Sequence, residues 1–234
     1  MSIQPREAII LAGGLGTRLR SAVPDLPKCM APVKGRPFVA YVLDYLRQQH
    51  ISRFIFAWGY KNEAFLDFLN TACIPDAYTL SVEPEPLGTG GAVQLACAEV
   101  KGNNVLVVNG DTFFRFDMDS MFTLHAQQSS ACTLALKKMV HIDRYGVVET
   151  EKDTGLVTGF REKQYYETGN INGGVYLLDK DMFLQKKLPE KFSFEKDYLE
   201  RFYAEKKFYG VVQNGFFIDI GIPEDYLRAQ QELD

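Results

Sequence analysis

The sequence has no apolar run of the roughly 18 residues that a membrane-spanning helix needs. It does not start with a basic stretch followed by an apolar one, as a secretory signal would. Its 26 Lys and Arg against 30 Asp and Glu give a formal net charge of -4, so it lacks the basic excess of most proteins that bind DNA or RNA. We therefore expect a cytoplasmic protein that binds neither a membrane nor a nucleic acid.

Cysteine and histidine are also scarce. The four cysteines are scattered, with no Cys-x-x-Cys pair: Cys29, Cys73, Cys97 and Cys132. This pattern predicts reduced thiols rather than disulfides or a metal site. The three histidines have no metal-ligand spacing either, and the chain shows no Ser-His-Asp or Cys-His constellation for nucleophilic catalysis.

What the chain does contain is enough apolar material for a large core, with 46% hydrophobic residues, 17 Phe and 12 Tyr. Apolar runs typical of strands alternate with helical patterns in the first half, and the second half is richer in strands. The pattern predicts strands at 8–11, 53–58, 78–82, 105–108, 133–138, 146–150, 156–162, 174–178 and 208–213. It predicts helices at 38–49, after Asn62, at 90–100, from Ser193 to about 205, and from Pro223 to Leu233.

This alternation predicts an α/β fold with a Rossmann-like, mixed and mostly parallel sheet flanked by helices. No Pro- or Ser-rich linker and no internal repeat divides the chain. We therefore expect residues 1–234 to form a single domain. The sequence leaves the oligomeric state open, a homodimer included.

A glycine-rich segment follows the first expected strand and is followed in turn by Pro27-Lys28: Leu11-Ala12-Gly13-Gly14-Leu15-Gly16-Thr17-Arg18-Leu19. Glycines at the end of a strand expose backbone N–H groups and let a ligand approach closely, while Arg and Lys add charge for phosphates. The segment is not a Walker A loop, because no Gly-Lys-Ser/Thr follows. It is not a dinucleotide fingerprint, because Leu19 replaces the third glycine and no acid follows the second strand. We expect phosphate binding here, by Leu11, Ala12, Gly13, Gly14, Gly16, Thr17, Arg18 and Lys28.

Two acids occupy positions that suit a cation. Asp111 directly follows a buried strand, and ligands gather at the carboxyl ends of strands in open α/β sheets. Asp219 is a lone acid between apolar residues, where an unpartnered carboxylate would be costly to bury. The alternative is that Asp219 caps the last helix.

The glycine-rich segment with its Pro-Lys resembles the signature of the nucleotidyltransferase family that makes nucleoside diphosphate sugars, and the resemblance extends over residues 8–226. It departs from the family pattern at Arg20-Ser21-Ala22 and at Cys29, where proline is common, and neither change removes a charged group. We expect Cys29 to be an inert small residue rather than an activated thiol. The resemblance implies a nucleotide-binding half at about 1–115 and a sugar-phosphate-binding half at about 116–234.

The same resemblance implies the roles of further residues. Asp111 and Asp219 would bind Mg²⁺, and the catalytic residues would be Arg18, Lys28, Asp111 and Lys163. The segments Tyr145-Gly146-Val147, Arg161-Glu162-Lys163 and Asn172-Gly173-Gly174-Val175-Tyr176 match, in order, family segments that contact the sugar phosphate. The residues expected to bind the sugar phosphate are Gly110, Tyr145, Gly146, Glu162, Lys163 and Asn172.

The stretch Glu83-Pro84-Glu85-Pro86-Leu87-Gly88-Thr89 bears on the choice of base. Guanine offers two adjacent donors, which an ionised carboxylate can accept together, whereas an amide side chain suits thymine or uracil better. We therefore expect GTP, with Glu83 or Glu85 reading the base and Gly88 and Thr89 contacting the nucleotide. The alternative is that both acids are merely exposed loop residues.

Within the family, this stretch and the segments around Asp143, Lys191 and Asp219 are most similar to the heptose 1-phosphate guanylyltransferases. That resemblance implies GTP and D-glycero-α-D-manno-heptose 1-phosphate as substrates, with GDP-heptose for cell-surface glycans and pyrophosphate as products. Two alternatives stay open. One is another pair, such as mannose 1-phosphate with GTP or a sugar phosphate with UTP or dTTP, and the other is a non-catalytic nucleotide sensor.

Overall fold

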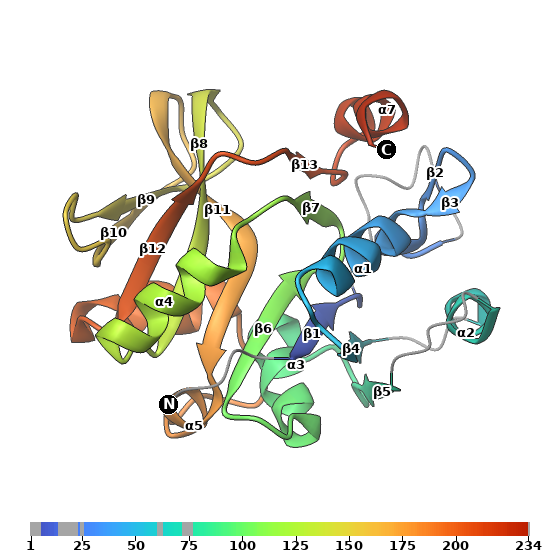
Figure 1. Cartoon of the computed structure of the whole chain (residues 1–234), viewed down its shortest axis with the longest axis horizontal. Helices are drawn as coiled ribbons and strands as arrows, with labels where there is room; N and C mark the ends of the chain where they lie inside the picture. The colour runs from blue at the N-terminus through green and yellow to red at the C-terminus, as the bar shows by residue number, and fades with distance from the viewer. Residues whose placement is uncertain (1–5, 14–22, 24–25, 60–62, 72–76, 234) are drawn as a thin grey trace.

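The computed structural model describes residues 6–13, 23, 26–59, 63–71 and 77–233. A nine-stranded sheet forms the centre of the molecule (Figure 1). Its strands are β1 (Glu7–Leu11), β4 (Arg53–Trp58), β5 (Ala77–Val82), β6 (Asn104–Asn109), β8 (Cys132–Ile142), β9 (Val147–Thr150), β10 (Val157–Arg161), β11 (Tyr166–Asp179) and β12 (Phe208–Gln213).

The sheet is mixed. Strands β6, β1, β4 and β5 lie side by side and parallel, and β12 runs parallel to β8. Strand β11 joins the two groups, antiparallel to both β6 and β8. Since β9 is antiparallel to β11, and β10 to β9, β10 and β11 run opposite to the other strands of this described sheet. The prediction of a mixed, mostly parallel sheet is therefore confirmed.

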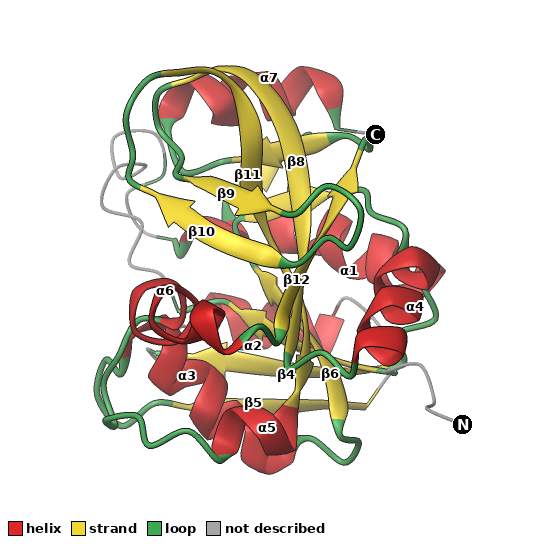
Figure 2. Ribbon diagram, turned by 90° about the vertical axis from the view of Figure 1, so that its left-hand side faces the viewer, coloured by secondary structure: helices red, strands yellow, loops and turns green. Residues whose placement is uncertain are grey.

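Helices cover both faces of the sheet, as predicted (Figure 2). The alternation of side chains along β1 explains this, because successive residues of a strand point to opposite faces. Ala8 and Ile10 belong to one buried apolar cluster, with residues of α1, α2, α4 and α7, whereas Ile9 belongs to another with α3 and α5. The helices are α1 (Phe38–Gln48), α2 (Glu63–Thr71), α3 (Gly88–Ala96), α4 (Met118–Gln128), α5 (Lys180–Leu184), α6 (Glu200–Phe202) and α7 (Pro223–Glu232).

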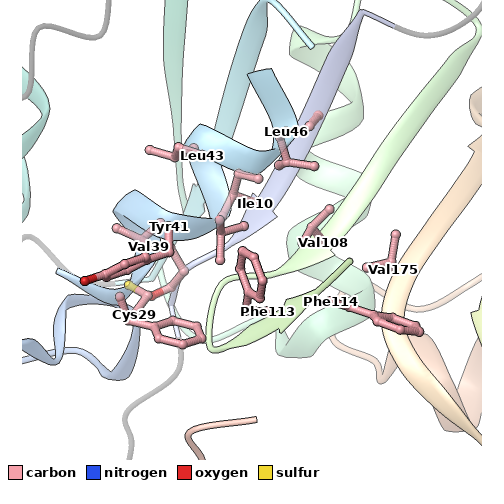
Figure 3. Close-up of a cluster of buried hydrophobic side chains, with 14 of the residues drawn as sticks. Ile10, Cys29, Val39, Tyr41, Leu43, Leu46, Val108, Phe113, Phe114 and Val175 are labelled. Carbon is pink, nitrogen blue, oxygen red and sulfur yellow. The ribbon is translucent and has the colours of Figure 1, made fainter. Parts of the chain in front are cut away.

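The first cluster fixes α1 on the parallel strands (Figure 3). Leu43 and Leu46 of α1 lie over Ile10 of β1 and Val108 of β6, and all four are buried. Leu43 and Leu46 are three positions apart and so lie on the same side of α1, which faces the sheet. Helix α1 thereby covers the strands whose ends carry the site.

Shorter elements complete the fold. Strands β2 (Pro32–Val33) and β3 (Arg36–Pro37) form a hairpin, and β7 (Thr112–Phe114) pairs antiparallel with β13 (Phe217–Asp219). The 3-10 helices are η1 (Lys28–Met30), η2 (Cys97–Glu99) and η4 (Tyr203–Glu205), and η3 (Phe194–Leu199) is a π-helix. The helix expected from Ser193 to about 205 is thus divided into η3, α6 and η4. None of the helices in the described part of the chain is long and apolar enough to cross a membrane.

Candidate functional site

A cavity of about 580 Å³ opens at the carboxyl ends of β1, β4, β5 and β6, the edge at which the sequence predicts ligand binding. It is lined by Leu11, Ala12, Gly13, Lys28, Cys29, Ala57, Gly59, Glu83, Pro84, Glu85, Pro86, Gly88, Thr89, Ala92, Asn109 and Asp111. Nine residues predicted from the sequence to bind or act on the nucleotide are among them: Leu11, Ala12, Gly13, Lys28, Glu83, Glu85, Gly88, Thr89 and Asp111. Four others, Gly14, Gly16, Thr17 and Arg18, lie outside the described residues.

The start of the glycine-rich segment passes very close to the loop after β4. A Cβ placed on Gly13 would lie 2.9 Å from the Gly59 nitrogen and 3.3 Å from Oε1 of Glu83. Real side chains do not come that close to backbone, so no larger residue fits at Gly13 without moving one of the two segments. The glycine lets three strand ends meet at one wall of the cavity.

Lys28 and Asp111 form an ion pair in this cavity, with 3.1 Å between Lys28 Nζ and Asp111 Oδ2. Lys28 begins η1 directly after Pro27, and its side chain is only 14% exposed. A cation so placed neutralises the acid and presents positive charge to the cavity. The pair combines the two charged groups that the sequence assigns to phosphate and metal.

The neighbouring Cys29 does not share this chemistry. Its thiol is buried and donates to the Ala12 carbonyl oxygen at 3.7 Å. Burial, and then the negative Asp111, raise the pKa of Cys29, which keeps the thiol protonated. This agrees with the expectation of an inert residue. Cys97 and Cys132 are likewise free and buried.

Asp219 lies beside Asp111 because β13 pairs with β7. Asp219 is opposite Thr112 in that pairing, and the Ile220 N–H donates to the Asp111 carbonyl oxygen at 3.1 Å. Burial and the negative charge of Asp111 raise the pKa of Asp219, whereas the Gly221 N–H, Lys28 and the Tyr145 hydroxyl oppose that rise. Two acids that destabilise each other's charge form a place where a cation is favourable.

The alternative role of Asp219, as a cap of the last helix, is wrong. Helix α7 begins at Pro223 with Ile222 at its N-cap, and no side chain caps it. The Asp219 carboxylate instead accepts hydrogen bonds from the Gly221 N–H and the Tyr145 hydroxyl. Among the described residues, no three His, Cys, Asp or Glu side chains cluster as a metal cage would require. Two carboxylates nevertheless suit Mg²⁺, which commonly takes one or two of them together with substrate phosphates and water.

The structure distinguishes Glu83 from Glu85. Glu83 follows β5, and its Oε2 accepts from the Leu87 N–H at 2.8 Å while Oε1 faces Gly13 and Gly59. Its carboxylate is therefore fixed and partly buried in the cavity wall. Glu85 is exposed at the rim. Of the two acids, Glu83 is the one held in a defined orientation in the cavity wall.

The glycines after Leu87 have a structural role that the sequence did not reveal. The Gly90 N–H donates to the Phe192 carbonyl oxygen at 2.9 Å, and the Phe192 N–H donates to the Leu87 carbonyl oxygen at 3.0 Å. Thr89 Oγ1 accepts from the Phe194 N–H at 2.9 Å. Thr89 therefore lines the cavity and also binds the segment that leads into η3, which Leu87 and Gly90 hold as well.

The residues expected on the sugar-phosphate side lie outside the lining of this cavity. Gly110 is buried, with its N–H donating to the Leu11 carbonyl oxygen at 2.9 Å. Gly146 passes tightly against the Arg161 carbonyl oxygen, which a Cβ there would approach to 2.8 Å. Glu162 and Lys163 are exposed on the turn between β10 and β11. Their roles stay predictions.

Asn172 is fixed by its own strand, at an irregularity of the pairing between β11 and β8. Its Nδ2 donates to the Tyr176 hydroxyl at 2.8 Å, and its Oδ1 accepts from the Gly174 N–H at 3.0 Å. The buried Tyr176 in turn donates to Glu195 Oε1 at 3.5 Å. The structure thus brings Glu195 of η3 near Asn172, a proximity that the sequence expectation did not contain.

Tyr145 reaches the site by its side chain. Its hydroxyl donates to Asp219 Oδ2 at 3.3 Å, and its ring packs edge-on against Phe217 with 6.1 Å between centroids. Burial and the nearby Asp219 raise the pKa of Tyr145, so the hydroxyl stays protonated and can donate. The family resemblance implied that this segment contacts the sugar phosphate. A lone tyrosine in a loop gives no signal that its hydroxyl contacts Asp219.

Comparisons with known proteins agree with this geometry. Residues 7–234 match the family model described as nucleotidyl transferase. The chain is 48% identical over 227 residues to D-glycero-alpha-D-manno-heptose 1-phosphate guanylyltransferase of Aneurinibacillus thermoaerophilus, covering 97% of this chain and 98% of the relative. It is 44% identical over 220 residues to the protein of the same name from Campylobacter jejuni, covering 94% and 96%. The crystal structure of HddC from Yersinia pseudotuberculosis complexed with GMP-PN superposes with a TM-score of 0.84 at 34% identity, covering 97% of this chain and 99% of that one.

Proposed function

The chain belongs to the nucleotidyl transferase family, and we propose that it transfers GMP from GTP to D-glycero-α-D-manno-heptose 1-phosphate, with Mg²⁺. The observation that carries the proposal is that Glu83, Lys28 and Asp111 line one cavity at the ends of parallel strands. A base-reading acid, a phosphate-binding cation and a metal-binding acid are the three groups that a guanylyltransferase needs there. The two relatives of 48% and 44% identity support the choice of sugar phosphate.

Glu83 supports the choice of guanine. Because its Oε2 accepts from the Leu87 N–H, the carboxylate cannot turn away from the cavity without losing that bond. The remaining lone pairs can accept from the two adjacent donors of guanine, whereas the O4 and O2 acceptors of uracil would face a negative charge. We assign base recognition to Glu83 rather than to the exposed Glu85.

The reaction needs charge neutralisation more than proton transfer. A phosphate oxygen of the sugar phosphate attacks the α-phosphorus of GTP and forms the new P–O bond. The bond from the α-phosphorus to the oxygen bridging to the β-phosphorus breaks, and pyrophosphate leaves with that oxygen. The attacking oxygen is already an anion near pH 7, so no general base is required.

The residues of this chain then act by position and charge. Lys28 neutralises charge that builds up near the α-phosphorus, and Arg18 is proposed to do the same for the leaving pyrophosphate. Lys163 is proposed to bind the sugar phosphate and so to offset the repulsion between this anion and the GTP phosphates. Mg²⁺ held by Asp111 and Asp219 would supply further charge stabilisation of the transferring phosphoryl group.

The test is pyrophosphate release with and without Mg²⁺, with GTP, UTP, CTP, dTTP and ATP against a panel of sugar 1-phosphates. We expect release with GTP and the heptose phosphate, and none without the metal. Release of pyrophosphate with GTP and mannose 1-phosphate instead would change the assigned sugar substrate to mannose 1-phosphate. Release with UTP or dTTP would overturn the assignment of Glu83, and nucleotide binding without release from any pair would indicate a sensor.

A further inference from the structure

The proposed metal acid Asp219 is connected to the last helix through two sets of contacts. Its own oxygens are both engaged: Oδ1 accepts from the Gly221 N–H at 2.7 Å, and Oδ2 accepts from Tyr145 at 3.3 Å. These two donors fix the plane of the carboxylate. The position of the Asp219 carboxylate therefore depends on the contacts that fix β13 and Tyr145.

Tyr145 lies in the loop between β8 and β9, where no strand pairing fixes it. The Arg144 guanidinium lies over the Tyr145 ring, 5.6 Å from its centroid. Arg144 Nη2 donates to Asp225 Oδ2 of α7 at 2.7 Å. The hydroxyl that contacts Asp219 is thus joined to α7 through a stacked guanidinium, an arrangement that restrains both side chains.

The strand β13 is held from the same helix. Arg228 Nη1 donates to Asp225 Oδ1 at 3.0 Å, and Arg228 Nη2 donates to the Phe217 carbonyl oxygen at 3.2 Å. Phe217 begins β13, two residues before Asp219. Both oxygens of Asp225 are therefore paired with arginines, one leading to Tyr145 and the other to β13.

Asp225 is an unusual residue for the surface helix α7. Its side chain is only 9% exposed, although it carries a charge. A buried carboxylate is tolerated when it is paired and hydrogen-bonded, and breaking one of its pairs is costly. Its neighbour Glu224 is exposed in the same first turn, so favourable charge at a helix start does not explain the burial of Asp225.

We propose that Asp225 is a positioning residue for metal binding, which holds Asp219 through Arg144–Tyr145 on one side and through Arg228–β13 on the other. The inference rests on the proposed function, because it takes Asp219 to be a ligand of the divalent cation. Partners that orient a metal-binding side chain commonly change metal affinity by about 10–100-fold when removed. Because Asp225 reaches Asp219 only through other residues, we expect its removal to weaken metal affinity less, about three- to tenfold.

The experiment measures Mn²⁺ binding by electron paramagnetic resonance, in the presence of a non-hydrolysable GTP analogue, with the analogue alone as baseline. Asp225→Asn should weaken Mn²⁺ binding about three- to tenfold, and Tyr145→Phe about tenfold. The half-saturating Mg²⁺ concentration for pyrophosphate release should rise in parallel, with turnover at saturating Mg²⁺ changed much less. Glu224→Gln removes a charge from the same turn of α7 and should change none of these quantities.

The double variant separates positioning from general stability. If Asp225 acts in part through the Tyr145 hydroxyl, Asp225→Asn should weaken Mn²⁺ binding less in the Tyr145→Phe background than in the wild type. Full additivity, or unchanged Mn²⁺ binding in a folded Asp225→Asn variant, would overturn the inference. If that variant does not fold, Arg144→Ala replaces it, because the Arg144 side chain is 40% exposed, with the same expected loss and the same refuting result. Failure of the wild type to bind Mn²⁺ would instead count against the proposed function.

Discussion

The side of the site that is proposed to bind the nucleotide (the nucleotide side) and the side that is proposed to bind the sugar phosphate (the sugar side) are built differently. On the nucleotide side, parallel strands end at one edge, and Glu83, Lys28 and Asp111 are each fixed by a hydrogen bond or ion pair of 2.8 to 3.1 Å. On the sugar side, Glu162 and Lys163 are exposed on the connection from β10 to β11, two strands that run in the same direction on either side of β9. Lys163 makes no ion pair with any described residue.

This difference has a physical reason. Parallel strands need covered faces and end together, so groups at their ends are close before any ligand arrives. An exposed connection between strands has few neighbours, so its side chains lose conformational entropy when a ligand binds. The nucleotide side should therefore contribute mainly to turnover, and the sugar side mainly to the affinity for the sugar phosphate.

The largest effect should come from Lys28. Lys28→Ala removes a preorganised positive charge and leaves Asp111 unpaired, and it should lower turnover by about a hundred- to a thousandfold. The measurement is the rate of pyrophosphate release at saturating substrates. The exposed Lys152 offers a matched control, since Lys152→Ala should leave the rate within about twofold. Unchanged turnover in Lys28→Ala would show that Lys28 is not catalytic.

A pH prediction concerns the framework of the sugar side. His125 of α4 is buried and contacts Thr133 of β8, with 2.9 Å between Nδ1 and Oγ1. Burial lowers the pKa of His125 from 6.5 to about 4. The unfolded chain therefore takes up a proton first as the pH falls below 6.5, and the folded protein loses on the order of 3 kcal/mol by pH 4.

Urea unfolding at pH 7 and at pH 4 measures this loss. His125→Gln should remove most of the pH dependence of the free energy of unfolding that is due to this residue. His50→Asn, at an exposed position with a φ of 63° that Asn tolerates, should keep it. Equal pH slopes in the wild type and in His125→Gln would contradict the prediction.

The fold of the nucleotide side could be predicted closely from the sequence. The strand at 53–58 was predicted to the residue, and those at 8–11 and 78–82 to within one residue. Strands buried on both faces give continuous apolar runs, which are the clearest local signal. On the sugar side, β11 was predicted at 174–178 but spans Tyr166–Asp179, because its first half pairs with β8 beyond the core and carries polar and glycine residues.

In the site, too, some features could be predicted from the sequence and others could not. The sequence predicted residues whose chemistry follows from a local motif, such as Lys28 after Pro27 or Asp111 after a buried strand. It did not predict β7, β13, α4 or α5, nor the partners that complete the site. Arg144 and Asp225 are 81 positions apart, and nothing local to either residue indicates the other. Long-range ion pairs depend on the packed structure, so a single sequence does not reveal them.

The contact between the two sides can be tested at Gly90. A Cβ there would lie 2.2 Å from two ring carbons of the buried Phe192, so Gly90→Ala should destabilise the protein by about 1–3 kcal/mol through overpacking. Gly102→Ala is the matched control, since its Cβ would meet no atom closer than 3.5 Å. Urea unfolding measures both. A Gly90→Ala variant as stable as Gly102→Ala would show that the 190–194 segment moves aside at little cost.

The smallest effect, and the sharpest test of the comparison, should come from Lys163. Lys163→Ala should raise the KM for the sugar phosphate about tenfold, equivalent to roughly 1.4 kcal/mol, because it removes one exposed contact to an anion. The KM for GTP should stay unchanged, and turnover should fall much less than in Lys28→Ala. Steady-state kinetics with each substrate varied in turn measures this. If turnover fell as far as in Lys28→Ala, Lys163 would act in the transition state, and the sugar side would have to close over the cavity during the reaction. The exposed position of Lys163 would then be that of the protein before substrate binding. The nucleotide side would be formed before the substrates bind and the sugar side only afterwards, and both sides would contribute to turnover.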